Sequence, residues 1–212
     1  MNKLDSAIKA LQNGEILLLH DASGREDEVD MIIHAKLVTP QTIQKLRKQA
    51  GGLICLATDG PTAEKIGIKH MTDYMLESGE EILKQLCPAK TAYGDKPAFS
   101  LWLNHNKTFT GITDTDRALT ITEFEKMISQ GKHANFPKEF YSPGHVPTLI
   151  ARDIKKRRGH TELSIQLTKL AGLTPAIVLC EMMGDDCKAL SIDDAEKYAQ
   201  ENGLILLDGG AI

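Results

Sequence analysis

The chain has 212 residues, of which 42% are apolar and 25% are charged, the balance of a globular protein with a substantial core. Its net charge of -4 and isoelectric point near 6.0 argue against a nucleic-acid binder, because such proteins usually carry a basic surplus. No stretch approaches the ~18 consecutive apolar residues of a membrane span, and the four cysteines lack CxxC spacing. We therefore expect one domain, residues 1–212, in a cytoplasmic protein with reduced thiols that binds neither nucleic acid nor membrane.

The first part of the chain alternates between apolar and polar segments. Apolar side chains at the i, i+3, i+4 and i+7 positions of residues 4–11 predict an amphipathic helix. Residues 16–19 form a short unbroken apolar run, which predicts a strand buried on both faces. Residues 20–28 are too polar for the core and are expected to form a loop or a strand rim, before apolar character resumes at residues 31–33.

Later segments continue to interleave helices with strands. Thr39 suits a helix N-cap and Pro40 the first helical position, so we expect a helix from there to about Ala50. Further strands are expected at 53–57, 99–103, 177–180 and 204–207, and further helices at 123–130, 161–171 and 192–201. This interleaving predicts an α+β fold, a mixed β-sheet layered with helices.

An acidic segment, residues 25–30, directly follows the first predicted strand. Clustered carboxylates repel one another, which a solvated loop tolerates and a divalent cation relieves. If the segment is extended, Glu26, Glu28 and Asp30 share one face and Arg25 lies on the other. One face would then present three carboxylates.

A basic segment precedes the helix predicted at 161–171. Arg157, Arg158, Gly159, His160 and Thr161 lie where a loop turns into this helix. The free amides of a helix N-terminus favour an anion, and arginines ahead of it can bind phosphate oxygens in a fork. The segment therefore suits a phosphate site, or simply a helix cap with a structural histidine.

Two further segments carry groups suited to proton transfer. His145 lies in a predicted turn, residues 142–147, whose prolines and glycine fix the backbone around one imidazole, and it is either a solvated side chain or an acid/base group. Glu181 ends the strand predicted at 177–180, where a partly desolvated carboxylate could act as acid or base. A hydroxyl- and acid-rich segment, residues 108–117, suits helix capping at Thr113 and beyond.

Taken together and in this order, these segments resemble 3,4-dihydroxy-2-butanone 4-phosphate synthase, particularly its single-domain archaeal form. The resemblance spans nearly the whole chain. The matching segments are residues 25–30, 51–55, 110–113 with 116–117, 143–145, 157–162 and 179–186.

The resemblance implies a homodimeric lyase of riboflavin biosynthesis that converts D-ribulose 5-phosphate to L-3,4-dihydroxybutan-2-one 4-phosphate and formate. It implies a divalent cation, usually magnesium with manganese possible, and no organic cofactor. By resemblance, Glu26 and His160 ligate the metal, and His145 and Glu181 are the catalytic residues. The substrate-binding residues that it implies are Arg25, Glu26, Asp30, Arg157, Arg158, Gly159, His160, Thr161 and Glu181.

The chain departs from the family pattern in the acidic loop. Ala22-Ser23-Gly24 stands where many members are more acidic, and Val29 stands where a glycine is often found. Two other functions would use similar residues: a phosphosugar isomerase or aldolase, which releases no formate, and a phosphometabolite-binding module of the same fold. Mere binding would not require Glu26, His145, His160 and Glu181 together.

Overall fold

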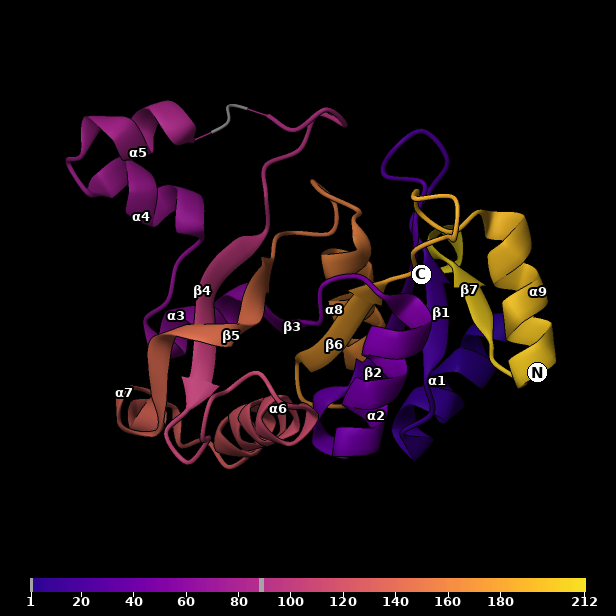
Figure 1. Ribbon diagram of the computed structural model, residues 1–212, viewed down its shortest axis with the longest axis horizontal. Coiled ribbons are helices and arrows are strands. Elements are labelled where there is room, and N and C mark those ends of the chain that lie inside the picture. Colours follow the sequence, from indigo (N-terminus) through magenta and orange to yellow (C-terminus); the bar gives the residue numbers. More distant parts are fainter. Residues whose placement is uncertain (1, 88–89) are drawn as a thin grey trace.

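A mixed seven-stranded β-sheet forms the centre of the protein in the computed structural model, which describes residues 2–87 and 90–212 (Figure 1). The strand order is β4-β5-β3-β6-β2-β1-β7. The strands are β1 (Leu17–His20), β2 (Val29–His34), β3 (Cys55–Asp59), β4 (Phe99–His105), β5 (Phe140–Ala151), β6 (Ala176–Glu181) and β7 (Leu206–Asp208). The β1–β7 and β3–β5 pairs are parallel and the other pairs antiparallel, so the expected mixed α+β architecture is confirmed.

Helices cover both faces of this sheet. They are α1 (Lys3–Asn13), α2 (Pro40–Lys45), α3 (Gly60–Ile66), α4 (Met71–Glu77), α5 (Glu81–Leu86), α6 (Asp114–Ser129), α7 (Phe136–Glu139), α8 (His160–Leu170) and α9 (Ile192–Asn202). Short 3-10 segments occupy Ala35–Leu37, His133–Asn135 and Gly209–Ala211, and α2 continues as a π-helical turn, Leu46–Ala50. Within the described residues, no helix has the length and apolar character needed to cross a membrane.

Two apolar layers explain the unbroken hydrophobic runs in the sequence. Successive residues of a strand point to opposite faces, so both faces of a central strand must be apolar when helices cover both. Leu18 packs in the layer that includes Phe124 of α6, whereas Leu17 and Leu19 pack in the layer that includes Leu163 of α8. All three leucines are fully buried, as a strand between two helical layers requires.

The sequence placed most of these elements correctly and missed several. The helix expected at residues 123–130 begins nine residues earlier, at Asp114, because Thr113 already caps it by accepting from the Asp116 amide. The strand expected at 53–57 begins only at Cys55. The prolines and glycine of residues 142–147 indicated a turn, so β5 was not predicted. The helices α3, α4, α5 and α7 were not predicted either.

The antiparallel strands β1, β2 and β6 bring three chain segments to one edge of the sheet. Asp30, near the start of β2, pairs with Leu19 near the end of β1 and with Glu181 at the end of β6. The loop after β1 and the segments that precede β4 and α8 extend at the same end of the molecule (Figure 1). This edge therefore gathers residues from distant parts of the sequence.

Candidate active site

A cavity of about 320 Å³ lies at this edge of the sheet. It is lined by six of the residues selected from the sequence, together with Glu28, Cys55 and Tyr93. The six are Glu26, Asp30, Arg157, His160, Thr161 and Glu181. Acidic, basic and apolar surfaces meet in it, as is typical of a site that orients a polar small molecule.

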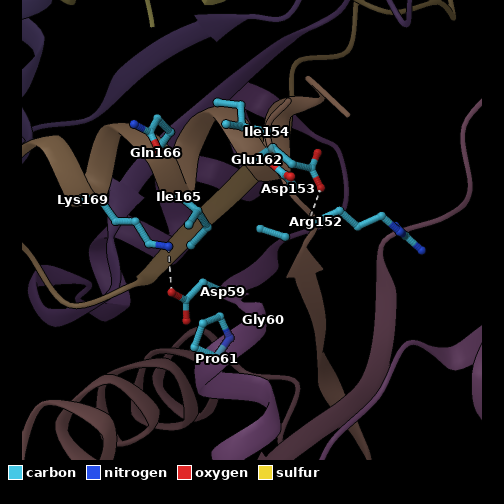
Figure 2. Close-up of a pocket in the computed structure, with 11 residues that line it drawn as sticks. Asp59, Gly60, Pro61, Arg152, Asp153, Ile154, Glu162, Ile165, Gln166 and Lys169 are labelled. Atoms are coloured by element: carbon cyan, nitrogen blue, oxygen red, sulfur yellow. Dashed lines mark hydrogen bonds and ion pairs between the residues drawn. The ribbon is translucent and has the colours of Figure 1, made fainter. Parts of the chain in front are cut away.

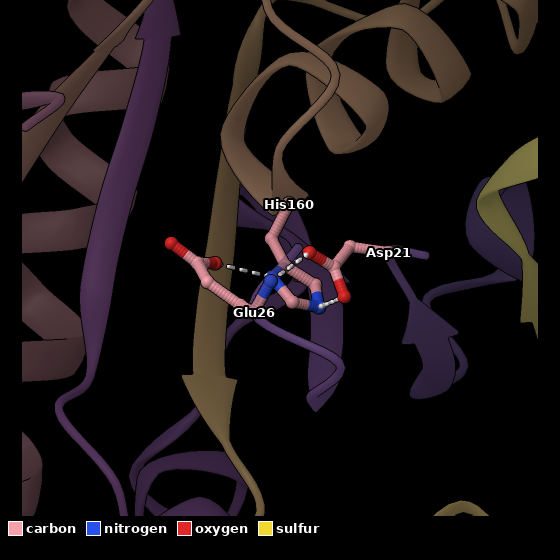
Figure 3. A group of neighbouring side chains, drawn as sticks. All are labelled: Asp21, Glu26 and His160. Carbon is pink, nitrogen blue, oxygen red and sulfur yellow. Dashed lines mark hydrogen bonds and ion pairs between the residues drawn. The ribbon is translucent and has the colours of Figure 1, made fainter. Parts of the chain in front are cut away.

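Three side chains converge beside this cavity, two from the loop between β1 and β2 and one from the start of α8 (Figure 3). Asp21 follows β1, Glu26 lies in the loop before β2, and His160 is the first residue of α8. Their potential ligand atoms all lie within 4.8 Å of one another, and Glu26 Oε2 is 3.2 Å from His160 Nδ1. The other ring nitrogen of His160 is 3.0 Å from the carbonyl oxygen of Glu28, which holds the ring in place.

The charges of this cluster shift the pKa values of its members. Burial lowers the pKa of the His160 imidazole, but the carboxylates of Asp30 and Glu26 outweigh burial and raise it to about 9. Burial raises the pKa of the Glu26 carboxyl, but the hydrogen bond with His160 and the charge of Arg25 outweigh it and lower this pKa to about 2. Asp21 likewise keeps a pKa below its usual value against the opposing effect of burial, through His160 and Arg25.

Asp30 adds a further carboxylate beside the cluster. Its Oδ1 lies 3.8 Å from His160 Nε2 and is a buried oxygen without a hydrogen-bond partner within the described residues. Burial raises the pKa of Asp30, the charge of His160 opposes this rise, Glu181 adds to it, and the result is about 7. Such an oxygen costs free energy unless a proton or a cation satisfies it.

These donors fit a divalent cation. Asp21, Glu26 and Asp30 supply carboxylate oxygens, which magnesium and manganese prefer, and His160 supplies one imidazole nitrogen, which suits manganese better than magnesium. A cation would also relieve the repulsion among the carboxylates and satisfy the free Asp30 oxygen. Because His160 must lose a proton before a ring nitrogen can bind a cation, cation binding and deprotonation are coupled.

Two guanidinium groups meet beside Gly159, the residue before His160. A Cβ at residue 159 would lie 2.5 Å from Arg25 Nη2 and 2.6 Å from Arg157 Nη1, so only glycine allows both arginines to approach. Asp95 bridges them: its Oδ2 accepts from Arg25 Nη2 at 3.0 Å and lies 3.6 Å from Arg157 Nε. The Tyr93 ring packs 4.9 Å from the Arg25 guanidinium carbon. The pair, here called the arginine cradle, thus holds the Asp95 carboxylate close to the N-terminus of α8, where an anion is favoured.

Glu162 holds Arg157 of this cradle in place. Its buried carboxylate forms an ion pair with Arg157 through Oε2, which also accepts from the Gly159 amide, while Oε1 accepts from the Arg152 amide at 2.8 Å. The Glu162 side chain is fully buried and that of Arg157 is 6% exposed. The Glu162 carboxylate thus stabilises both the position of the Arg157 side chain and the backbone turn that leads into α8.

The structure adds two details about these segments: residues 25–28 do not form a strand, and Arg158 lies apart from the cavity. Residues 25–28 are not extended, because Asp27 has a positive φ of 57° and the chain turns before β2 begins, so strict alternation of faces does not hold there. Glu26, Glu28 and Asp30 nevertheless line the same cavity. Arg158 was expected to bind substrate, but it is exposed and donates to the Gly209 carbonyl near the C-terminus, away from the cavity.

Glu181 lies within the cavity at the end of β6. Its Oε2 accepts from the Leu53 amide at 2.7 Å, which orients the carboxylate. Gly52 makes this possible, because a Cβ there would lie 2.6 Å from the Glu181 carbonyl oxygen and 2.8 Å from its Cβ. The Gly51–Gly52 pair thus ends the preceding helix and also leaves room for Glu181.

His145 is outside this cavity. It was expected in a turn, but it lies in β5, where the pairing with β4 is interrupted. The His145 side chain is exposed to solvent. Of the residues of β5, Leu149 lines the cavity and His145 does not. Within one chain, therefore, the structure does not bring His145 together with Glu26 and His160.

A second cavity of about 330 Å³ lies along α8, between this helix, the start of α3 and the end of β5 (Figure 2). Lys169 and Asp59 form an ion pair of 2.8 Å across it, and the carboxylate of Glu162 faces it. Among the described residues, its lining includes no histidine or cysteine, and its charged groups are three carboxylates and two cations. We assign the candidate active site to the first cavity, because Glu26, His160 and Arg157 line it. Asp21 and Arg25 lie directly behind these lining residues.

Three functional candidates escaped sequence reasoning: Asp21, Tyr93 and Asp95. Asp21 is the first residue after β1, so its position at a strand end was a usable signal. Tyr93 and Asp95 belong to an irregular segment before β4, and no local pattern connects them with the arginines that they contact. Only the tertiary structure reveals them.

Known proteins share both the sequence and the fold. Residues 5–212 match the family model for 3,4-dihydroxy-2-butanone 4-phosphate synthase. The chain is 47% identical over 214 residues to the 3,4-dihydroxy-2-butanone 4-phosphate synthase of Methanothermobacter thermautotrophicus, covering 99% of this chain and 93% of that protein.

Two solved structures of synthases with this name are also similar. The structure from Candida albicans has a TM-score of 0.77 and 28% identity over 99% of this chain and 95% of that chain. A synthase in complex with two magnesium ions has a TM-score of 0.80 and 25% identity over 99% of this chain and 94% of that chain. The chain therefore belongs to the 3,4-dihydroxy-2-butanone 4-phosphate synthase family.

Proposed function

We propose that this protein converts D-ribulose 5-phosphate to L-3,4-dihydroxybutan-2-one 4-phosphate and formate, the step that supplies riboflavin biosynthesis with its four-carbon unit. One observation carries the proposal: the cluster of Asp21, Glu26 and His160 lies beside the cradle formed by Arg25 and Arg157. A phosphorylated ketose needs both features, one for its phosphate and one for its carbonyl and hydroxyl oxygens.

The phosphate would bind at the arginine cradle. Arg25 now donates to Asp95 through Nε and Nη2, so a phosphate would take the place of the Asp95 carboxylate there. Arg157 Nε has no hydrogen-bond partner among the described residues and is open to the same anion, and the first amides of α8 add the positive end of the helix dipole. Thr161 is buried in the first turn of α8 and lines the cavity, so its hydroxyl is available to a bound ligand.

Glu26 and His160 would hold a divalent cation, with Asp21 and Asp30 beside them. Magnesium is the cation we favour from the family, and manganese suits the imidazole. When bound, such a cation acts as a Lewis acid that makes the proton next to a carbonyl easier to remove. The reaction needs no organic cofactor.

Glu181 is placed to move that proton. Its carboxylate lines the cavity and is oriented by the Leu53 amide, and it lies on the strand neighbouring Asp30. Arg25 and the α8 N-terminus fix the substrate by its phosphate, so the reacting carbons are held at a constant distance from Glu181. The binding energy of the phosphate thus contributes to orientation of the remote carbons.

We propose that the enzyme is a homodimer in which His145 of a second copy completes the cavity. His145 is exposed, and apolar side chains are exposed on the neighbouring segments: Phe109 is 94% and Ile112 52% exposed, on either side of Gly111. Tyr141, four residues before His145 on β5, is 45% exposed. Apolar groups clustered around an exposed histidine are what a subunit interface would cover.

The direct test is to incubate the purified protein with ribulose 5-phosphate and magnesium and to measure formate. We expect formate in a one-to-one ratio to consumed substrate, and loss of turnover with EDTA that added magnesium or manganese restores. Turnover without formate would indicate an isomerase or aldolase. Binding of ribulose 5-phosphate without turnover would indicate a binding module.

A further inference from the structure

We propose that Asn104 is a positioning residue that fixes the tautomer of the His145 imidazole, so that the ring presents its Nε2–H group to the substrate. The inference deepens the proposed function, in which His145 is a catalytic residue. It rests on a backbone irregularity and on the hydrogen bonds of one buried amide.

The irregularity is a large bulge in β5. On β4, Leu103 pairs with Val146 and the next residue, Asn104, pairs with Tyr141. Residues 142–145 therefore have no partners on β4 and are pushed out of the ladder. Bulges occur beside active sites, where they redirect a side chain, and this one carries His145.

Asn104 fills the space inside the bulge. Its side chain is 2% exposed, and its Oδ1 accepts from the His145 backbone amide at 2.8 Å. Because a backbone amide can only donate, this bond identifies which amide atom of Asn104 is the oxygen. The Nδ2 group then lies 2.9 Å from the Tyr141 hydroxyl and 3.2 Å from His145 Nδ1.

Gly111 lies against the Asn104 amide. Its φ is +91°, and a Cβ at this position would overlap the side-chain amide of Asn104. The backbone of the loop after β4 therefore packs directly on the amide. A close backbone approach of this kind requires glycine.

These contacts determine where the neutral imidazole carries its proton. Asn104 Nδ2 has two hydrogens, one for the Tyr141 hydroxyl and one for His145 Nδ1, so Nδ1 is an acceptor and the ring proton is on Nε2. The other tautomer would place an Nδ1–H beside this donor. Within the described part of the chain, that hydrogen would have one acceptor, Asn104 Oδ1 at 3.3 Å, which already accepts the shorter backbone bond.

The tautomer decides what His145 can do. A neutral ring with a proton on Nε2 can donate a hydrogen bond to a substrate oxygen but has no lone pair on that nitrogen to accept a proton from carbon. The carbon–hydrogen bond would then break toward the Glu181 carboxylate, which gains the proton, while the electron pair moves into the enediolate. His145 would stabilise the negative oxygen so formed.

Nuclear magnetic resonance of the protein labelled with ¹⁵N-histidine tests the tautomer directly. We expect the long-range ¹H–¹⁵N pattern of a proton on Nε2 for His145, assigned by comparison with His145→Ala. In Asn104→Asp, which has nearly the same shape but cannot donate, the proton should move to Nδ1. Tyr141→Phe, the matched control, should keep it on Nε2. A proton on Nδ1 in the wild type would overturn the proposal, as would an unchanged tautomer in Asn104→Asp.

Kinetics test whether the tautomer matters. We expect Asn104→Asp to lower kcat about 100-fold, the size of an acid–base contribution, with KM changed less than about twofold. In a His145→Ala background the same substitution should cost nothing further, whereas an equal loss there would show a merely structural role. If Asn104→Asp does not fold, the wild-type spectrum alone decides. Absence of formate release by the wild type would refute the proposed function but leave the tautomer measurement valid.

Discussion

Neutralising Glu162 should destabilise the protein and weaken its phosphate site together. In Glu162→Gln the Arg157 guanidinium, whose side chain is 6% exposed, loses the carboxylate with which it pairs. Leaving one charge of a buried pair without its partner costs about 3–5 kcal/mol. Asp95, 3.6 Å from Arg157 Nε, retains part of the stabilisation, so we expect the lower limit, about 3 kcal/mol.

Urea denaturation at one fixed protein concentration measures the free energy of unfolding that Glu162→Gln loses. In the same variant, the KM for ribulose 5-phosphate should rise about tenfold, equivalent to about 1.4 kcal/mol of lost binding. Asp59→Asn is the matched control, because Asp59 faces the same second cavity (Figure 2) but pairs with a Lys169 side chain that is 47% exposed. Asparagine keeps the N-cap of α3, so the control should lose less than about 1 kcal/mol. Equal, small losses in both variants would refute the reasoning.

Three further predictions follow from the charges and from the proposed interface. The pKa of His160 is raised to about 9, and His160 must lose its proton to bind a cation. The affinity of the protein for manganese should therefore rise about tenfold per pH unit up to about pH 9 and level off above it. Calorimetry in buffers of different ionisation enthalpy should detect the released proton, and an affinity that does not change with pH would contradict this. An equimolar mixture of His145→Ala and Glu181→Ala chains should recover about one quarter of wild-type activity, because half of the dimers are mixed and each of these has one intact site; sites formed within one chain would recover none. Burial lowers the pKa of His34, whose Nε2 donates to the Thr174 carbonyl at 2.8 Å, so the free energy of unfolding should fall as the pH drops below about 6.5. His34→Asn should flatten that fall, and an unchanged slope would exclude His34 as its source.

The parts of the fold that could be predicted are those dictated by local pattern. Uninterrupted apolar runs identified β1, β3 and β6, because a strand covered on both faces has no polar side to disguise it. β5 lacks such a run at its start, since the bulge at residues 142–145 carries proline, glycine and histidine rather than alternating apolar residues. Its existence depends on pairing with β4, which no local signal encodes.

The candidate site divides in the same way. Glu26, His160 and Glu181 could be selected because each belongs to a short motif at the end of an element. Asp95 acquires its role from contact with Arg25, 70 residues away, so its immediate neighbours give little indication. Asp21 stands at a strand end, which was a usable signal, but its position beside His160 depends on the tertiary structure. Arg158 shows the converse: it shares a motif with Arg157, but the turn into α8 points the two side chains to different places.

Pulsed electron paramagnetic resonance of bound Mn²⁺ tests most directly whether Glu26 and His160 share one cation. With ¹⁵N-histidine-labelled protein, we expect a hyperfine coupling from a single imidazole nitrogen, which disappears in His160→Asn, and a Glu26→Gln variant that binds Mn²⁺ at least about tenfold more weakly. Tightly bound Mn²⁺ without nitrogen coupling, or a coupling that survives in His160→Asn, would contradict the proposed metal site.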